Sequence, residues 1–116
     1  MWTSSTKKEE LRTMIKHIVL WKLKDYAEGK TKQQNALRLK KELEELNGQI
    51  PGLIHLEVGI NINNNGDDNA DVILYSEFEN MEALASYYPH PLHKKIVPFA
   101  QAIRNERRVI DYEVSN

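Results

Sequence analysis

The chain has 116 residues, which is the length of one globular domain and leaves no room for a second independent core. Sixteen basic residues against seventeen acidic residues leave a formal net charge of −1, so a nucleic-acid-binding protein is not expected. Cysteine is absent, which excludes disulfides, thiolate metal sites and a cysteine nucleophile.

Neither a signal peptide nor a membrane helix is expected at the beginning of the chain. No segment approaches the roughly 20 apolar residues that a membrane helix needs, and lysines and glutamates occupy positions 7–10, where a signal peptide needs apolar residues. We therefore expect a cytoplasmic protein that does not contact membranes. Residues 1–13 are expected to be a poorly ordered N-terminal extension, and residues 14–116 are expected to form the domain.

The first patterned segment, residues 14–23, has the alternation of a strand and is apolar on both faces near its middle. His17 and Trp21 share one face, whereas Ile18 and Leu20 share the other. Exposing Ile18 and Leu20 to water would forgo roughly 1.5–3 kcal/mol for each side chain. We therefore expect helices to cover one face and a second copy of the chain to cover the other, in a symmetric dimer.

A helix is expected over residues 31–46, because Thr31 is a suitable N-cap and Asn47-Gly48 is a suitable stop. Its apolar residues recur at spacings of three and four, which defines one buried stripe. The stripe consists of Ala36, Leu39, Leu43 and Leu46. The rest of this helix is charged and should face solvent.

Two strands joined by a hairpin follow. Residues 53–62 alternate, and the face expected to be buried consists of Ile54, Leu56, Val58, Ile60 and Ile62. Residues 63–69 are rich in asparagine, aspartate and glycine, which favours a hairpin loop. Residues 70–79 are the next expected strand.

The last third of the chain is expected to contain two helical pieces and a final strand. Asn80 is placed to cap the first helix, and its buried side is expected to consist of Met81, Leu84, Ala85 and Tyr88. Pro98 should begin or kink the second piece, whose apolar residues are Ile96, Phe99, Ala100 and Ile103. Residues 107–114 form the final strand, with Val109 and Asp111 on one face.

The element order is therefore β-α-β-β-α-β. This order predicts an α+β fold of the ferredoxin-like, split βαβ type, with helices on one face of a four-stranded antiparallel sheet. In such a plait the first and last strands are antiparallel neighbours, which should bring Asp111 near His17. A sandwich or an open α/β fold fits less well, because the chain has few strands and joins two of them by a short hairpin.

Reactive side chains are concentrated in the segment 87–93, which reads Tyr-Tyr-Pro-His-Pro-Leu-His. Its two prolines restrict the backbone, so the tyrosines and histidines are carried by a stiff bend. A stiff bend suits a binding or catalytic site. It equally suits a helix break whose polar side chains only cap backbone groups.

Three segments together resemble the stress-responsive dimeric α/β-barrel (Dabb) family: MIKHIVLWKLKD, IPGLIHLEVGIN and the run from EFENMEALASYY to VIDYEV. The resemblance covers residues 14–114, and its best markers are Lys-His-Ile-Val and His-Pro-x-His. It implies a ferredoxin-like protomer whose sheet packs against that of a partner to form a barrel. Most members have no established biochemical role, so the resemblance implies a fold more firmly than an activity.

A plant branch of this family cyclises polyketides, and its active site is similar to several positions of this chain. The resemblance implies a catalytic tyrosine at Tyr87, a catalytic histidine at His93 and a supporting aspartate at Asp111. His17 matches a histidine that lines the same pocket. The polyketide substrate itself is not carried over, because function depends on the site and not on the fold.

These residue types suit proton transfer without a cofactor. His93 could take a proton from a carbon next to a carbonyl, Asp111 could hold the other ring nitrogen of His93, and Tyr87 could donate to the developing enolate oxygen. The pocket is expected between sheet and helices, and its wall residues are expected to include His17, Val19, Trp21 and Val109. A cofactor-free lyase or cyclase that acts on a small molecule is one hypothesis.

Two alternatives stay open. The same cluster of histidine, tyrosine and aspartate could be structural, in a non-catalytic dimeric module for binding or stress tolerance. A divalent metal on His17, His90, His93 and Asp111 is chemically possible, but no dense ligand motif is present and no metal is expected. Bulky Trp21 and Tyr88 could also fill the pocket.

Overall fold

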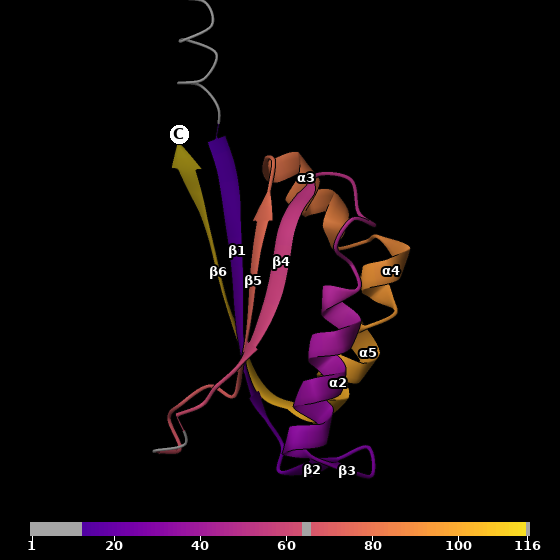
Figure 1. Cartoon of the computed structure of the whole chain (residues 1–116), viewed down its shortest axis with the longest axis vertical. Helices are drawn as coiled ribbons and strands as arrows, with labels where there is room; N and C mark the ends of the chain where they lie inside the picture. Colours follow the sequence, from indigo (N-terminus) through magenta and orange to yellow (C-terminus); the bar gives the residue numbers. More distant parts are fainter. Residues whose placement is uncertain (1–12, 64–65, 116) are drawn as a thin grey trace, which may run out of the picture.

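The computed structural model describes residues 13–63 and 66–115. A four-stranded antiparallel sheet forms one layer, and the helices pack on one of its faces (Figure 1). The elements are β1 (Thr13–Leu23), β2 (Tyr26–Ala27), β3 (Lys30–Thr31), α2 (Lys32–Glu44), β4 (Leu53–Ile60), β5 (Val72–Phe78), α3 (Met81–Tyr87), α4 (Pro91–Lys94), α5 (Val97–Ile103) and β6 (Arg104–Ser115). The expected extension, residues 1–13, lies outside the described residues except for Thr13, which begins β1.

The strand order is β4-β5-β1-β6, so the first and last strands are neighbours, as the sequence predicted. This order and the helices on one face confirm the ferredoxin-like α+β fold. The sequence did not predict the short β2–β3 hairpin, which leads into α2 and turns at Glu28 and Gly29 with positive φ. No helix within the described ranges is long and apolar enough to cross a membrane.

The core lies between the sheet and the helices. β1 contributes its alternate residues from Ile15 to Leu23, all of them buried, and His17 is among them. α2 contributes the predicted stripe of leucines and Ala36, and its N-terminus is closed by a capping box in which Thr31 and Gln34 bond each other's backbone. The helical stripe of Phe99 and Ile103 is buried as expected.

Two expected burial patterns are wrong. The register of β4 against β5 shifts between Leu53 and His55, so Leu53 is buried and Ile54 is exposed, because an irregularity of this kind adds a residue to one strand. In α3 the expected Leu84 is buried, but Met81, Ala85 and Tyr88 are exposed, and Tyr87 is buried instead, where its ring packs against Phe78 and His93.

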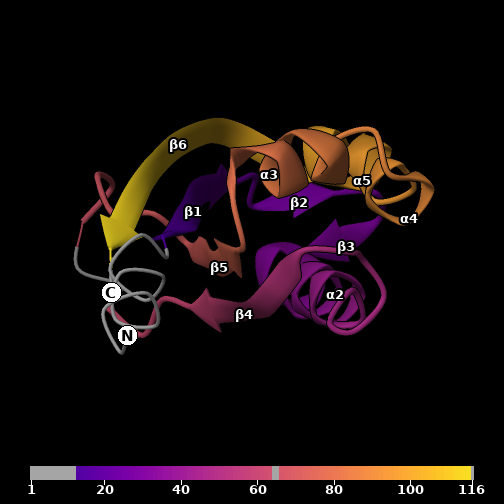
Figure 2. The same ribbon diagram turned by 90° about the horizontal axis from the view of Figure 1, so that it is seen from above.

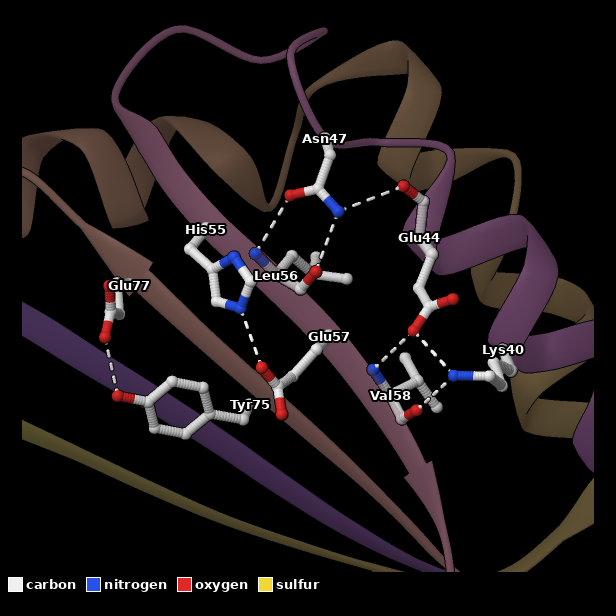
Figure 3. Close-up of polar contacts among 9 residues, drawn as sticks. All are labelled: Lys40, Glu44, Asn47, His55, Leu56, Glu57, Val58, Tyr75 and Glu77. Carbon is white, nitrogen blue, oxygen red and sulfur yellow. Dashed lines mark hydrogen bonds and ion pairs between the residues drawn. The ribbon is translucent and has the colours of Figure 1, made fainter.

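Side chains from α2 and from the turn after it cover the free edge of β4 (Figure 3). Asn47 bonds both backbone groups of Leu56, accepting from its N–H at 2.9 Å and donating to its carbonyl at 2.7 Å. Glu44 accepts from the Val58 N–H at 3.0 Å, and Lys40 donates to the Val58 carbonyl at 2.7 Å. These bonds replace those that a neighbouring strand would make.

On the other face of the sheet, no helix of the described residues is packed (Figure 2). Ile18 lies opposite Tyr75 on β5 and Ile110 on β6, and Leu20 lies opposite Ile73. Ile110 is 61% exposed and Ile73 is 37% exposed. The helix-free face therefore has the apolar centre that the sequence predicted.

Candidate functional site

A cavity of about 270 Å³ lies between β1 and the helices. Its walls come from β1, α2, β5 and the segment from α3 to the start of β6. Most of the wall is apolar. The polar or aromatic residues on it are His17, Trp21, Tyr87, Tyr88, His93, Gln101, Arg104 and Arg107. Trp21 and Tyr88 thus form walls of the cavity and do not fill it.

His17 is buried and is held by Asp111, which lies directly opposite it on β6. The distance between His17 Nδ1 and Asp111 Oδ1 is 2.5 Å. Because an ionised carboxylate only accepts, His17 Nδ1 donates, and its Nε2 is left for other partners. The expected bond from Asp111 to His93 is wrong, whereas the expected proximity of Asp111 to His17, which follows from the neighbouring first and last strands, is confirmed.

The ring of His93 forms a hydrogen bond with a backbone carbonyl of the preceding bend. Its Nδ1 lies 3.0 Å from the Tyr88 carbonyl oxygen, which can only accept, so Nδ1 carries the proton. Burial of the ring lowers the pKa of His93, although its bond to the Tyr88 carbonyl opposes this shift. The neutral ring with a free Nε2 lone pair is therefore favoured near pH 7.

Tyr87 packs against the His93 ring, with their centroids 4.3 Å apart. Its hydroxyl is buried and has no hydrogen-bond partner among the described residues. Burial raises the pKa of this hydroxyl far above its ordinary value, so it stays protonated and can serve as a donor. The buried Trp21 Nε1 likewise lacks a partner in the described part of the chain.

The remaining expected residues are placed as follows. Val19 lines the cavity, whereas Val109 and Asp111 do not, and Asp111 reaches it only through His17. His90 caps the start of α4, where its Nδ1 accepts from the Leu92 N–H at 3.1 Å. Within residues 13–63 and 66–115, no group of three or more histidine, aspartate or glutamate side chains could hold a metal ion.

Two arginines at the cavity were not anticipated. Arg107 lies opposite Trp21 on the helix-facing side of β6, and Arg104 lies at the start of the same strand. The alternation of β6 was a sufficient signal for Arg107, because it places this residue on the same face as Val109 and Asp111.

Residues 15–114 match the Dabb family, whose description is "Stress responsive A/B Barrel Domain". The chain belongs to this family. The Dabb match accounts for the fold and for nearly all of the described residues. Among curated proteins, none matches the sequence.

Several solved structures are similar to the Dabb domain. It is similar to a dimeric ferredoxin-like protein of unknown function from Bacteroides fragilis, with 33% identity, a TM-score of 0.77 and coverage of 87% of this chain and 96% of that one. A protein from Arabidopsis thaliana has 25% identity, a TM-score of 0.72 and coverage of 88% and 96%. A hydroxynitrile lyase from Passiflora edulis, at 14% identity, a TM-score of 0.68 and coverage of 89% and 94%, shares the fold alone.

Proposed function

We propose that the domain binds a small carbonyl compound in this cavity and catalyses proton transfer at the carbon beside the carbonyl, without a cofactor. The observation that carries the proposal is the convergence of His93 and Tyr87 on one largely apolar cavity. A free imidazole nitrogen and an unpartnered hydroxyl are a base and a donor of the kinds that enolisation needs. This reaction class includes lyases and cyclases.

The proton-transfer step uses residues of this chain alone. His93 Nε2 takes the proton of the carbon, and the electron pair of the C–H bond forms the enolate double bond while the carbonyl π electrons pass to oxygen. The Tyr87 hydroxyl donates a hydrogen bond to that oxygen. His17, positioned by Asp111, is a wall residue of the cavity and holds the substrate beside these two groups.

Deuterium exchange tests this chemistry without knowledge of the natural substrate. The probes are phenylacetone and acetylacetone in D₂O near neutral pH, with exchange followed by proton NMR. We expect exchange above the buffer rate, and a loss of about 10²-fold or more in the enzymatic rate in His93→Ala. Lys94→Ala is the control, because it alters a neighbouring exposed residue that does not line the cavity. Equal rates in wild type and His93→Ala would refute the assignment.

A second candidate function is a binding module in which the same cluster is structural. It is favoured by the His17–Asp111 and His93–Tyr88 bonds, since both would also stabilise the fold without any reaction. Under this alternative the probes bind but do not exchange, and His93→Ala lowers the free energy of unfolding by about 1–3 kcal/mol.

We also propose that the working unit is a homodimer. Support comes from the apolar helix-free face and from relatives described as dimeric. A stable dimer would bury at least about 1,000 Å² in total. Light scattering at micromolar concentration should give twice the 13.5 kDa mass of one chain, and a mass of one chain would refute the dimer.

A further inference from the structure

The charges on the cavity wall are all of one sign. Arg104 and Arg107 line the cavity, and no aspartate or glutamate lines it with them. Among the described residues, neither guanidinium forms an ion pair, whereas Arg38, Lys40 and Lys41 on α2 each pair with a glutamate four residues along. The cavity wall therefore carries two guanidinium groups that no ion pair within the described residues neutralises.

The charge of Arg107 acts close to the groups assigned to proton transfer. The pKa of Tyr88 is raised by burial and by the nearby Asp111 charge, and the Arg107 guanidinium opposes this rise from a position beside the hydroxyl. Arg107 also opposes the rise in the pKa of Tyr87 and adds to the lowering of the pKa of His93. A negative group bound to Arg107 would thus lie near both Tyr87 and His93.

The size and polarity of the cavity restrict the ligand further. About 270 Å³ is near the lower end of ligand cavities and holds a molecule of about ten non-hydrogen atoms, taking roughly 30 Å³ for each water-sized group. Val19, Leu39 and Leu43 make much of the wall apolar. The ligand should therefore combine a compact apolar body with one anionic group at its end.

We propose that the cavity binds small 2-oxo acids and related carboxylates, with the carboxylate held by Arg107. This inference rests on the proposed function and specifies its substrate class. A 2-oxo acid carries its carboxylate, its carbonyl and its acidic C–H on consecutive carbons. Arg107 would hold the carboxylate, Tyr87 would donate to the carbonyl oxygen, and His93 would take the proton of the C–H group. A guanidinium suits a carboxylate because its planar fork can donate two parallel hydrogen bonds.

Binding of a matched pair of probes tests the carboxylate preference separately from catalysis. The probes are 3-phenylpropionate and its amide, which have the same shape and differ in charge, and binding is followed by chemical-shift changes in NMR. We expect the wild type to bind the acid about tenfold more tightly than the amide. Arg107→Gln should abolish this preference and leave binding of the amide unchanged, while Arg107→Lys should retain part of it.

Lys94→Gln is the matched control, because it removes one positive charge close to the site from a residue that does not line the cavity. It should keep the tenfold preference. Inorganic phosphate at equal concentration should not displace the acid; displacement would show a general anion site and overturn the carboxylate assignment. Circular dichroism confirms that each variant is folded.

The outcomes separate this inference from the proposed chemistry. Binding of the acid that depends on Arg107, without deuterium exchange, would support the carboxylate site and refute the proton-transfer function. Exchange of neutral ketones that depends on His93, with no preference for the acid, would support the proton-transfer function and refute the carboxylate site. Failure of both probes to bind would overturn the carboxylate site.

Discussion

The hydroxyl of Tyr87 is buried and has no hydrogen-bond partner in the part of the chain that the structure describes, which is costly for a group that serves only the fold. Tyr87→Phe should therefore leave the free energy of unfolding unchanged or raise it by about 1 kcal/mol, while deuterium exchange falls at least tenfold. Urea denaturation and the exchange assay measure the two effects. Tyr26→Phe, at an exposed residue of β2, should change neither. A destabilised Tyr87→Phe with normal exchange would show that the hydroxyl is structural.

The lowered pKa of His93 leads to a prediction about pH. Burial lowers the folded-state pKa below the unfolded value of about 6.5, so the folded protein binds fewer protons between the two values. Its contribution to stability is present above pH 6.5 and declines as the pH falls through the lowered pKa. The exchange rate should decline over the same window.

Titration of the histidine ring protons by NMR measures this pKa directly. His93→Gln identifies the resonance, because one of the four histidine signals disappears. We expect its midpoint below 6.5. A midpoint at or above 6.5 would contradict a neutral base held ready at pH 7.

The sequence predicted which residues would lie near the site better than it predicted their pairing. His17, Tyr87 and His93 do line one cavity. The expected bond between Asp111 and His93 was wrong, because the position of the His93 ring depends on where α4 packs, and the spacing of residues in the sequence does not contain that information. The strand register alone decides that Asp111 meets His17.

At the scale of elements, the edge of β4 depends on side chains from a helix. Asn47→Ala removes both bonds to Leu56 and leaves its N–H and carbonyl open at the sheet edge. We expect a loss of about 1–2 kcal/mol in the free energy of unfolding, because two backbone groups lose their partners. An open edge also pairs with other chains, so soluble higher oligomers should increase.

Urea denaturation and size-exclusion chromatography measure these two effects. Glu45→Ala is the control, since Glu45 follows α2 and pairs only with Lys41 at the surface, at 3.1 Å. It should be close to neutral. Wild-type stability and chromatographic behaviour in Asn47→Ala would show that water replaces the Asn47 bonds at no cost.

The sequence predicted the elements that have long, regular patterns and missed details set by packing. The alternation of β1 and the stripe of α2 were read correctly. The expected buried side of α3 was right only at Leu84, because a seven-residue helix has too few turns to define its buried side, and Tyr87 packs between Phe78 and His93. The shift in β4 leaves no signal in an apolar run such as Leu53-Ile54.

At the scale of the whole molecule, the two faces of the sheet have different cover. The helices cover one face and line the cavity there, whereas no helix within residues 13–63 and 66–115 covers the other face. Ile18, Leu20 and Ile73 lie in adjoining rows of that face, together with Ile110 on β6. Dimerisation through this face would leave the cavity of each protomer open on its own side.

Ile110→Lys tests the dimer with little effect on a single chain, because Ile110 is already 61% exposed there. Two-fold symmetry makes each substitution count twice, so about 1.5–3 kcal/mol of lost burial per chain weakens the dimer by roughly 10²–10⁴-fold. Sedimentation equilibrium measures the dissociation constant. Leu37→Lys is the control, since Leu37 is 51% exposed on α2, on the helical side of the sheet. An unchanged dissociation constant in Ile110→Lys would place the contact elsewhere, because a lysine cannot be buried in an apolar interface without weakening it.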